Sequence, residues 1–366
     1  MRHPRRPSPS AALALLSLAA LAACARGPVA TPSPAPAGPP WLEVQQSNTT
    51  ALLQAVSVVS DEVAWASGHQ GTWVRTLDGG RTWTPGRVAG ADTLQFRDVH
   101  AVSADTAFLL SAGSGALSRI YATTDGGLSW TLQHVNPDSA GFYDCMAFWD
   151  GEHGFVYGDE VGGRLVVVET SDGGRRWTRV DGDRLPPAQP GEGGFAASGT
   201  CAVTITALGR DRAWIGTGNA ARARVLRSVD SGRTWATSEP PLPGGEAAGA
   251  ASVAFRDAYT GVAAGGEIGR RDARGDYVTT TADGGATWRA GGRPTFAGAA
   301  YGAAYVPGAR RPTLFVLGPG GADWSLDDGR TFARVDTVAY WGLGFASPRA
   351  GWLVGPRGRV VKVRVE

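Results

Sequence analysis

The stretch that decides the fold is Thr76–Trp83, TLDGGRTW, because the chain repeats it five more times. The copies are TTDGGLSW (123–130), TSDGGRRW (170–177), SVDSGRTW (228–235), TADGGATW (281–288) and SLDDGRTF (325–332). Aspartate suits a tight turn because it accepts backbone N–H bonds a few residues on, and glycine supplies a conformation that is costly for other residues. The aromatic residue that follows buries a large apolar surface between sheets. We therefore interpret each copy as a structural turn, and the alternative, six repeated catalytic or metal-binding acids, requires cooperation between groups held too far apart.

The spacing of these turns predicts the architecture. Their aspartates are separated by 47, 47, 58, 53 and 44 residues, and they are Asp78, Asp125, Asp172, Asp230, Asp283 and Asp327. A period in the forties with strand-like segments is typical of propeller blades. Seven strand-like segments, from EVAWASG (62–68) to RAGWLVG (349–355), accompany only six turns.

The N-terminal segment WLEVQ (41–45) resembles the strand after each turn, with Trp41 in the place of the repeated tryptophan. We therefore expect this strand to close the last blade and Trp41 to be an interblade tryptophan, because closure removes the free sheet edge. The sequence thus predicts an all-β, seven-bladed β-propeller over residues 41–366.

The first forty residues have the composition of a targeting and tethering segment. A basic stretch (1–10) precedes thirteen apolar residues (11–23) and Cys24, which resembles a bacterial lipoprotein signal with a lipidated cysteine. The alternative is an ordinary signal peptide with a chance cysteine. Residues 25–40 contain six prolines and suit a semi-rigid tether. We expect a lipid-anchored protein of the cell envelope, facing the periplasm or in the outer membrane.

The charge balance gives no reason to expect nucleic acid as a partner. The chain has 35 Lys and Arg against 33 Asp and Glu, and removal of the predicted signal peptide with its three arginines leaves 32 against 33. Lys362 is the sole lysine and lies in an alternating terminal strand, which argues against lysine-based covalent catalysis. The 53 glycines and 23 prolines of the chain argue against long helices.

The repeated turn resembles the Asp-box, or bacterial neuraminidase repeat, S/T-x-D-x-G-x-T/S-W. Two groups of propellers carry it: sialidases with related glycoside hydrolases, and the photosystem II assembly and stability factors with their relatives in non-photosynthetic bacteria. The order of strand and turn in each unit is more similar to the second group. That resemblance implies that the turns are structural, that ligands bind on the opposite face, and that the protein acts as an assembly chaperone or scaffold.

The motifs of other chemistries are weak or missing. The sequence contains no Arg-Ile-Pro segment of sialidases, no G-x-S-x-G, no H-E-x-x-H and no C-x-x-C. GTGNAA (216–221) matches a relaxed dinucleotide-binding pattern, but Asp230 follows too soon for a packed helix. Scattered histidines give no metal-ligand spacing, so we expect neither a metal nor a cofactor.

Loops opposite the repeated turns provide the candidate binding residues. They are His69, Arg97, Tyr143, Asp144, Asp159, Glu160, Glu192, Arg222, Glu267, Tyr340 and Trp341. The 26-residue insertion 178–203 is the strongest local signal, since so long a loop in a compact domain is usually functional or disordered. Cys145 and Cys201 align near the starts of the inner strands of blades 3 and 4, where they form either a disulfide or two buried thiols.

The preferred function is that of a monomeric, non-enzymatic propeller that binds an envelope protein, with a glycan as the other ligand class. The first alternative is a glycoside hydrolase that pairs Asp159 or Glu160 with Glu192 or Glu267. The second is a redox enzyme that rests on GTGNAA alone.

Overall fold

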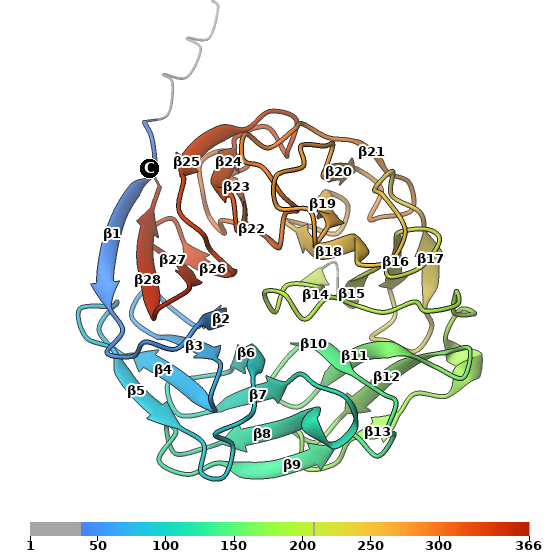
Figure 1. The fold of residues 1–366 in the computed structure, drawn as a ribbon, viewed down its shortest axis with the longest axis horizontal. Helices are drawn as coiled ribbons and strands as arrows, with labels where there is room; N and C mark the ends of the chain where they lie inside the picture. The colour runs from blue at the N-terminus through green and yellow to red at the C-terminus, as the bar shows by residue number, and fades with distance from the viewer. Residues whose placement is uncertain (1–37, 208, 366) are drawn as a thin grey trace, which may run out of the picture. The chain divides into compact units, whose positions relative to one another are not determined.

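The computed structural model describes residues 38–207 and 209–365. From Trp41 onward this part of the chain forms seven four-stranded antiparallel sheets arranged in a ring (Figure 1), and it contains no α-helix. The predicted seven-bladed all-β propeller is confirmed. The predicted signal peptide, Cys24 and the tether up to residue 37 lie outside the described residues.

Six blades follow chain order from the inner to the outer strand. Blade 1 consists of β2 (Leu53–Val58), β3 (Ala64–Gly68), β4 (Thr72–Thr76) and β5 (Thr84–Arg87). Blade 2 consists of β6 (Phe96–Ala101), β7 (Ala107–Ser111), β8 (Arg119–Thr123) and β9 (Thr131–Val135), with the short helix η1 (Gly115–Leu117). Blade 3 consists of β10 (Tyr143–Phe148), β11 (Gly154–Val161), β12 (Arg164–Thr170) and β13 (Thr178–Arg179), followed by η2 (Gly182–Arg184).

The second half of the ring repeats this pattern. Blade 4 consists of β14 (Ala202–Ala207), β15 (Arg210–Thr217), β16 (Arg224–Ser228) and β17 (Ala236–Ser238). Blade 5 consists of β18 (Ala248–Phe255), β19 (Gly261–Glu267), β20 (Val278–Thr281) and β21 (Arg289–Ala290). Blade 6 consists of β22 (Gly302–Tyr305), β23 (Leu314–Gly318), β24 (Gly321–Ser325) and β25 (Ala333–Asp336).

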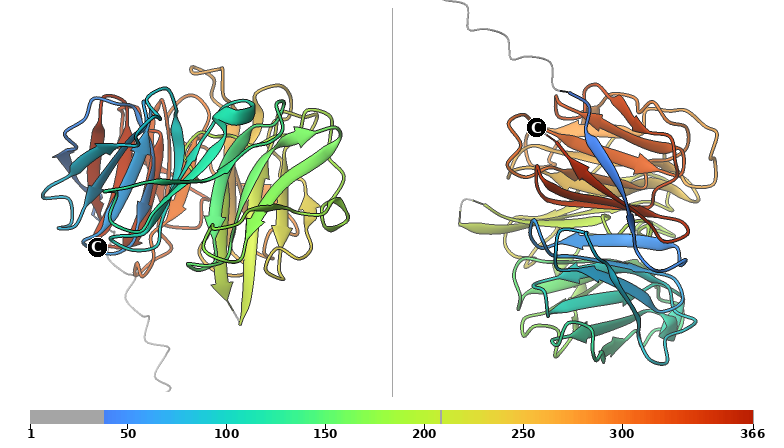
Figure 2. Two further views of the ribbon diagram at one scale, coloured as in Figure 1. Left: turned by 90° about the horizontal axis from the view of Figure 1, so that it is seen from below. Right: turned by 90° about the vertical axis from the view of Figure 1, so that its left-hand side faces the viewer.

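Blade 7 joins the two ends of the ring. Its inner strands are β26 (Gly342–Ser347), β27 (Ala350–Gly355) and β28 (Arg359–Arg364), and its outer strand is β1 (Trp41–Gln46). β1 pairs antiparallel with β28 in an unbroken register from Trp41↔Arg364 to Gln46↔Arg359. Figure 2 shows the two strands side by side at the edge of the ring. The predicted closure by the N-terminal strand is therefore confirmed.

The side chain of Gln45 connects three segments at this closure. Its Oε1 atom accepts a hydrogen bond from the Trp83 indole at 3.0 Å and another from the Trp352 indole at 2.9 Å. Trp83 belongs to the repeated turn of blade 1, and Trp352 lies on β27. Lys362 on β28 adds a hydrogen bond of 2.6 Å from its Nζ atom to the carbonyl of Gly79. The closing strand therefore fixes blade 7 to blade 1 as well as completing its own sheet.

Trp41 does not take the interblade position that its place in the repeat predicts. Its side chain is 46% exposed, and the Arg364 guanidinium lies 3.9 Å from its ring centroid. Arg364 belongs to the neighbouring strand of the same blade, so the contact is made within blade 7. The strand pairing was predicted correctly, but the burial of this tryptophan was wrong. The polar side chain of Gln45 is the buried one.

Each repeated turn is closed by its own side chains. In blade 2, Asp125 Oδ1 accepts hydrogen bonds from the Thr123 hydroxyl at 2.8 Å and from the Ser129 amide at 2.9 Å. The Gly127 amide donates to the Thr123 hydroxyl at 2.9 Å, and both turn glycines have positive φ. Hydrogen bonds from the Ser129 hydroxyl and amide lower the pKa of Asp125 to about 2. The carboxylate is thus occupied within its turn.

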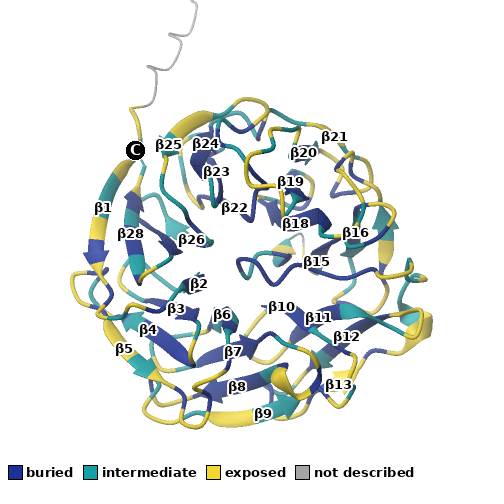
Figure 3. Ribbon diagram, in the orientation of Figure 1, coloured by how far each residue is buried: buried dark blue, intermediate teal, exposed yellow. Residues whose placement is uncertain are grey.

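The turn aromatics connect neighbouring blades. Trp83 packs edge-on against Trp352 with ring centroids 6.0 Å apart, and Trp235 packs against Phe155 at 5.4 Å. In each pair the partner belongs to the second strand of the preceding blade. Figure 3 shows the resulting core, with buried residues on the inner and middle strands and exposed residues on the outermost strands.

Candidate binding site at the channel mouth

The loops opposite the repeated turns surround one opening of the central channel, which we call the mouth. The longest of them connects β13 to β14 and occupies residues 180–201. It reaches the middle of the ring (Figure 1). Its residues 193–200, here called the plug, are largely buried: Phe195 is 8% exposed and Ser198 is 1% exposed. The long insertion is therefore an ordered part of the propeller.

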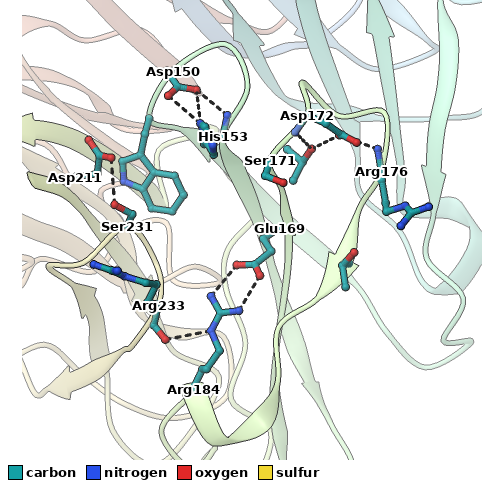
Figure 4. Close-up of a pocket in the computed structure, with 13 residues that line it drawn as sticks. Asp150, His153, Glu169, Ser171, Asp172, Arg176, Arg184, Asp211, Ser231 and Arg233 are labelled. Carbon is teal, nitrogen blue, oxygen red and sulfur yellow. Dashed lines mark hydrogen bonds and ion pairs between the residues drawn. The ribbon is translucent and has the colours of Figure 1, made fainter.

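The first half of the insertion lies between blades 3 and 4. The Arg184 guanidinium donates to both carboxylate oxygens of Glu169 at 2.7 and 2.8 Å. It also donates to the carbonyls of Gly232 and Arg233 in the repeated turn of blade 4 at 2.8 and 3.1 Å. Figure 4 shows the contacts of Arg184 with Glu169 and Arg233. Leu185 and Ala188 then pack against the hydrophobic core shared by the two blades. The segment wedges the two blades together.

Glu192 anchors the insertion just before the plug. It has no exposed surface, and both carboxylate oxygens pair with the Arg224 guanidinium. The Thr217 hydroxyl donates to Oε1 at 2.7 Å, and the backbone amide of Gln189 donates to Oε2 at 2.9 Å. Every acceptor site of this buried carboxylate therefore has a charged or polar partner, as a buried charge requires. Glu192 is not accessible as an acid, base or nucleophile.

On the side of blades 4, 5 and 6 the plug is held by backbone and hydroxyl groups. Gly193 and Gly218 exchange two backbone hydrogen bonds of 3.0 and 2.8 Å. The Thr200 hydroxyl lies 2.7 Å from the Ser252 hydroxyl, and the Ser198 hydroxyl donates to the Tyr301 carbonyl at 2.6 Å. These contacts leave no buried hydroxyl of the plug without a partner.

On the side of blades 1, 2 and 3 the plug is held by Gln54, Arg97 and Asp144. Each of them is the extra residue of a β-bulge near the start of an inner strand. A bulge turns a side chain away from its regular direction, here toward the channel. The Gln54 amide donates to the Ala196 carbonyl at 2.7 Å, and Arg97 does so at 3.5 Å. Asp144 Oδ2 accepts from the Gly194 amide at 3.1 Å. The plug thus contacts blades on all sides of the channel.

A disulfide fixes the end of the insertion. Cys145 on β10 is bonded to Cys201, which directly precedes β14, with their Cα atoms 6.0 Å apart. It joins the inner strands of blades 3 and 4, at the positions where the sequence alignment of the blades places the two cysteines. Together with the Glu192 anchor, it restrains the plug at both ends.

The polar wall of the mouth contains two interacting carboxyl groups. Asp144 is 2% exposed, and burial together with the neighbouring Asp159 raises its pKa well above the usual value. Burial also raises the pKa of Asp159, whose Oδ1 atom is buried without a hydrogen-bond partner among the described residues. Burial lowers the pKa of the Arg97 guanidinium, and Asp144 opposes this effect. The three groups form a connected polar cluster beneath the plug backbone.

His69 extends this wall toward blade 1. Its Nε2 atom lies 2.9 Å from Gln54 Oε1, and burial together with Arg97 lowers its pKa. On the side of blades 6 and 7 the mouth is aromatic, since Trp341 meets Tyr301 at a centroid distance of 4.9 Å and both belong to a cluster with Phe195. The mouth therefore presents a polar half and an aromatic half around a filled centre.

The structure places the predicted site residues in two groups. His69, Arg97, Asp144, Asp159 and Trp341 lie together around the plug. The other group has different partners and consists of Tyr143, Glu160, Glu192, Arg222, Glu267 and Tyr340. Its two tyrosines are buried at 1% and 0% exposure and hydrogen-bond to His134 and Asp336.

The charged members of that second group are engaged in local contacts. Glu160 accepts hydrogen bonds from the amides of Gly163 and Gly191, and so holds a turn. Arg222 forms an exposed ion pair with Glu239 at 2.7 Å, and Glu267 forms one with Arg270 at 3.6 Å. For these six residues the described contacts are local, and their expected place around one common opening stays a prediction.

Sequence reasoning missed Gln54, Asp98 and Tyr301. Asp98 is 3% exposed and accepts hydrogen bonds of 2.7 Å from the amides of Val99 and Met146, which connects the inner strands of blades 2 and 3. Burial raises the pKa of Asp98 to about 8. For the bulged position Gln54, the available sequence signal was the single extra residue in its inner strand.

The described residues contain no group of three or more His, Cys, Asp or Glu side chains that could hold a metal ion. Within 38–207 and 209–365, no helix has the length and apolar character needed to cross a membrane.

The ring, its filled channel and the two-sided mouth define a β-propeller whose channel is filled by residues of its own insertion. No family model matches the sequence. The chain is 28% identical over 180 residues to the photosystem II assembly lipoprotein Ycf48 of Synechococcus sp. (strain CC9902). The alignment covers 48% of this chain and 42% of that lipoprotein, so it spans less than half of the relative's length. It shows that the chain is homologous to Ycf48, and the predicted resemblance to photosystem II assembly factors is confirmed.

Solved structures show the same fold at low identity. YCF48 bound to D1 peptide matches with a TM-score of 0.58 at 16% identity, covering 89% of this chain and 97% of that one. YCF48 from Cyanidioschyzon merolae matches with a TM-score of 0.59 at 17% identity, covering 88% and 98%. The Niastella koreensis GH74 enzyme matches with a TM-score of 0.56 at 15% identity and covers 79% of this chain but 47% of its own.

Proposed function

We propose that the protein is an assembly factor that binds a segment of another protein at the channel mouth. The observation that carries this proposal is the homology to the photosystem II assembly lipoprotein Ycf48. A solved structure with the same fold is that of YCF48 bound to D1 peptide. The filled channel agrees with such a role, because the plug offers a partner chain a continuous ordered surface.

The mouth supports binding better than hydrolysis. Of the carboxyls assigned to a glycosidase mechanism, Glu192 is buried in its pair with Arg224, and Glu160 holds a turn. Glycoside hydrolysis requires two accessible carboxyls on either side of a bound sugar. Asp144 and Asp159 instead interact directly with each other beneath the plug.

A site-specific cross-linker tests this assignment. With benzoylphenylalanine in place of Trp341 at the mouth, irradiation in the cell is expected to give one dominant adduct, identified by mass spectrometry. The matched control places the same group at Tyr259, which is 53% exposed beyond the opposite end of the channel. Equal adducts from both positions, or none from Trp341, would contradict a partner site at the mouth.

We also propose that the mature protein is anchored by lipid on Cys24 and works in an oxidising compartment of the cell envelope. The order of basic stretch, apolar run and cysteine supports the anchor, and the Cys145–Cys201 disulfide supports the compartment. Metabolic labelling with a radioactive fatty acid is expected to label the native chain and not Cys24→Ser. Equal labelling of the two chains would contradict the proposed lipid anchor on Cys24.

A further inference from the structure

The groove between blades 2 and 3 contains an apolar pocket of about 190 Å³. One wall comes from blade 3 and consists of Val161, Val166, Val168 and Trp177, and the facing side includes His134, Asn136 and Tyr143. The same wall recurs one blade further on, where the chain covers it with its own insertion. The covered surface of blade 4 can therefore be compared with the pocket residue by residue.

The counterparts in blades 3 and 4 follow from the strand register. Trp177 and Trp235 end the repeated turn of their blades. The residue two positions later pairs with Val168 in blade 3 and with Leu226 in blade 4. Two residues earlier on the same strands, Val166 corresponds to Arg224. The two walls are therefore the same surface of two successive repeats.

In blade 4 this surface is occupied by Arg184–Gln189, RLPPAQ. The Trp235 amide donates to the Arg184 carbonyl at 3.1 Å, and the Arg224 guanidinium donates to the Pro187 carbonyl at 2.9 Å. Leu185 and Ala188 pack on the core cluster that contains Leu226 and Trp235. The occupant is thus a proline-containing segment that is bound through carbonyl groups and one large aliphatic side chain.

In blade 3 the equivalent surface is only partly covered: the β9–β10 connection lines the pocket with Pro137, Asp138 and Gly141, and a volume of about 190 Å³ remains. A donor beside this pocket lacks an acceptor. Asn136 is 5% exposed, and its Oδ1 atom accepts from the Asp138 amide at 3.1 Å. Its Nδ2 atom has no hydrogen-bond partner in this part of the chain. An unsatisfied buried donor is costly, and a ligand carbonyl would satisfy it as Pro187 satisfies Arg224.

The other walls suit the same kind of ligand. Trp177 adds an indole ring to the lining, and the rings of His134 and Tyr143 are stacked at a centroid distance of 6.0 Å. Grooves lined by aromatic side chains bind proline-rich segments because such segments are already extended and lose little conformational entropy on binding.

We propose that this groove binds an extended, proline-containing segment of the partner protein and that one aliphatic side chain of the segment enters the pocket. The inference rests on the proposed protein-binding function, and it adds a second contact region to the mouth. It also specifies the chemistry of the partner: apolar, rich in free carbonyl groups and without a requirement for charge.

A synthetic RLPPAQ peptide, the segment that fills the blade 4 surface, is the probe. It is titrated into the purified protein while the methyl signals of Val161, Val166 and Val168 are followed by NMR. We expect saturable shifts at these valines and at least about tenfold weaker binding of RAPPAQ, because Leu185 is the one large aliphatic side chain of the segment. Val161→Trp fills the pocket and is expected to weaken binding at least tenfold. Its matched control, Val44→Trp, is placed at a 76% exposed position on β1 and is expected to bind as the wild type does.

Three results would overturn the inference. They are the lack of valine shifts at about 1 mM peptide, equal binding of RLPPAQ and RAPPAQ, and tighter binding of a peptide of residues 30–40, which would assign the groove to this chain's own proline-rich segment. If Val161→Trp fails to fold, the wild-type valine shifts and the leucine dependence still decide. If the peptide does not bind but a specific adduct forms at Trp341, the groove is rejected and the proposed protein-binding function stands. If the peptide binds but no adduct forms, only the assignment of the partner site to the mouth is rejected.

Discussion

The closure of the ring predicts a large effect from a small substitution at Gln45. In Gln45→Leu the volume of the side chain is nearly retained and the pairing of β1 with β28 is unaffected. The indole N–H groups of Trp83 and Trp352 lose their shared acceptor, and both rings are at least 98% buried. A buried donor without a partner costs about 1–3 kcal/mol, so the two indoles together cost about 2–6 kcal/mol.

The expected change in melting temperature follows from the size of the domain. Unfolding entropy is about 2.1 cal/mol/K per residue, which gives roughly 0.7 kcal/mol/K for roughly 330 residues. The substitution is therefore expected to lower the Tm by about 3–9 °C in differential scanning calorimetry with the disulfide intact. Gln45→Glu keeps an acceptor for the two indoles, so its Tm is expected to fall less than that of Gln45→Leu.

Gln46→Leu is the matched control, because this neighbouring side chain on β1 is exposed. Its Tm is expected to stay within about 1 °C of the wild type. If Gln45→Leu and Gln46→Leu melt alike, the two indoles do not depend on Gln45, and its role in fixing blade 7 to blade 1 is refuted.

Three further predictions concern the ends of the chain, the insertion and the repeated turns. Removal of residues 1–40 is expected to leave the Tm unchanged, whereas removal of 1–46 also deletes β1 and should cause aggregation or a much lower Tm; equal calorimetric traces would contradict the closure. Glu192→Gln leaves the Arg224 guanidinium without its charged partner, which costs about 3–5 kcal/mol of stability, so hydrogen exchange of residues 193–200 should accelerate. The control Arg222→Gln removes an exposed ion pair and should leave the exchange rates of these residues unchanged. Hydrogen bonds from Ser129 lower the folded-state pKa of Asp125 to about 2, so the stabilising contribution of Asp125 is complete above about pH 4 and is lost as the pH falls toward 2. In urea unfolding across this pH range, the free energy of unfolding should fall less for Ser129→Ala than for the wild type. Identical pH profiles of the two proteins would contradict the role of these hydrogen bonds in the turn.

The fold was predictable because its signals are local and repeated. Each turn carries its own aspartate, glycines and aromatic residue within eight positions, and the spacing of the copies sets the number of blades. The closing strand was predictable for the same reason. The burial of Trp41 was not, because the strand pattern specifies pairing but does not fix which side chains of an outermost strand face the neighbouring blade.

The site was less predictable because its contacts join distant parts of the chain. The insertion 178–203 has no repeat partner, so its length indicated importance but not that residues 193–200 fill the channel. Gln54, Arg97 and Asp144 face the channel through single-residue bulges, which leave almost no trace in an alternating pattern. Tyr143 and Tyr340 lie in loop-like stretches of sequence, and only the packing of neighbouring strands shows that they are buried.

The pairing of β1 with β28 also fixes the order in which the protein becomes stable. β1 leaves the ribosome first, yet Gln45 meets Trp352 across 307 residues of sequence. Until β28 is made, β1 has no partner and blade 7 has an open edge, so the complete ring forms only after β28 has been synthesised. Contacts at such long range fold slowly, and the unpaired edge is exposed to aggregation meanwhile. The chain can therefore stay unfolded during synthesis without loss, since nothing stable has to be undone before β1 and β28 meet.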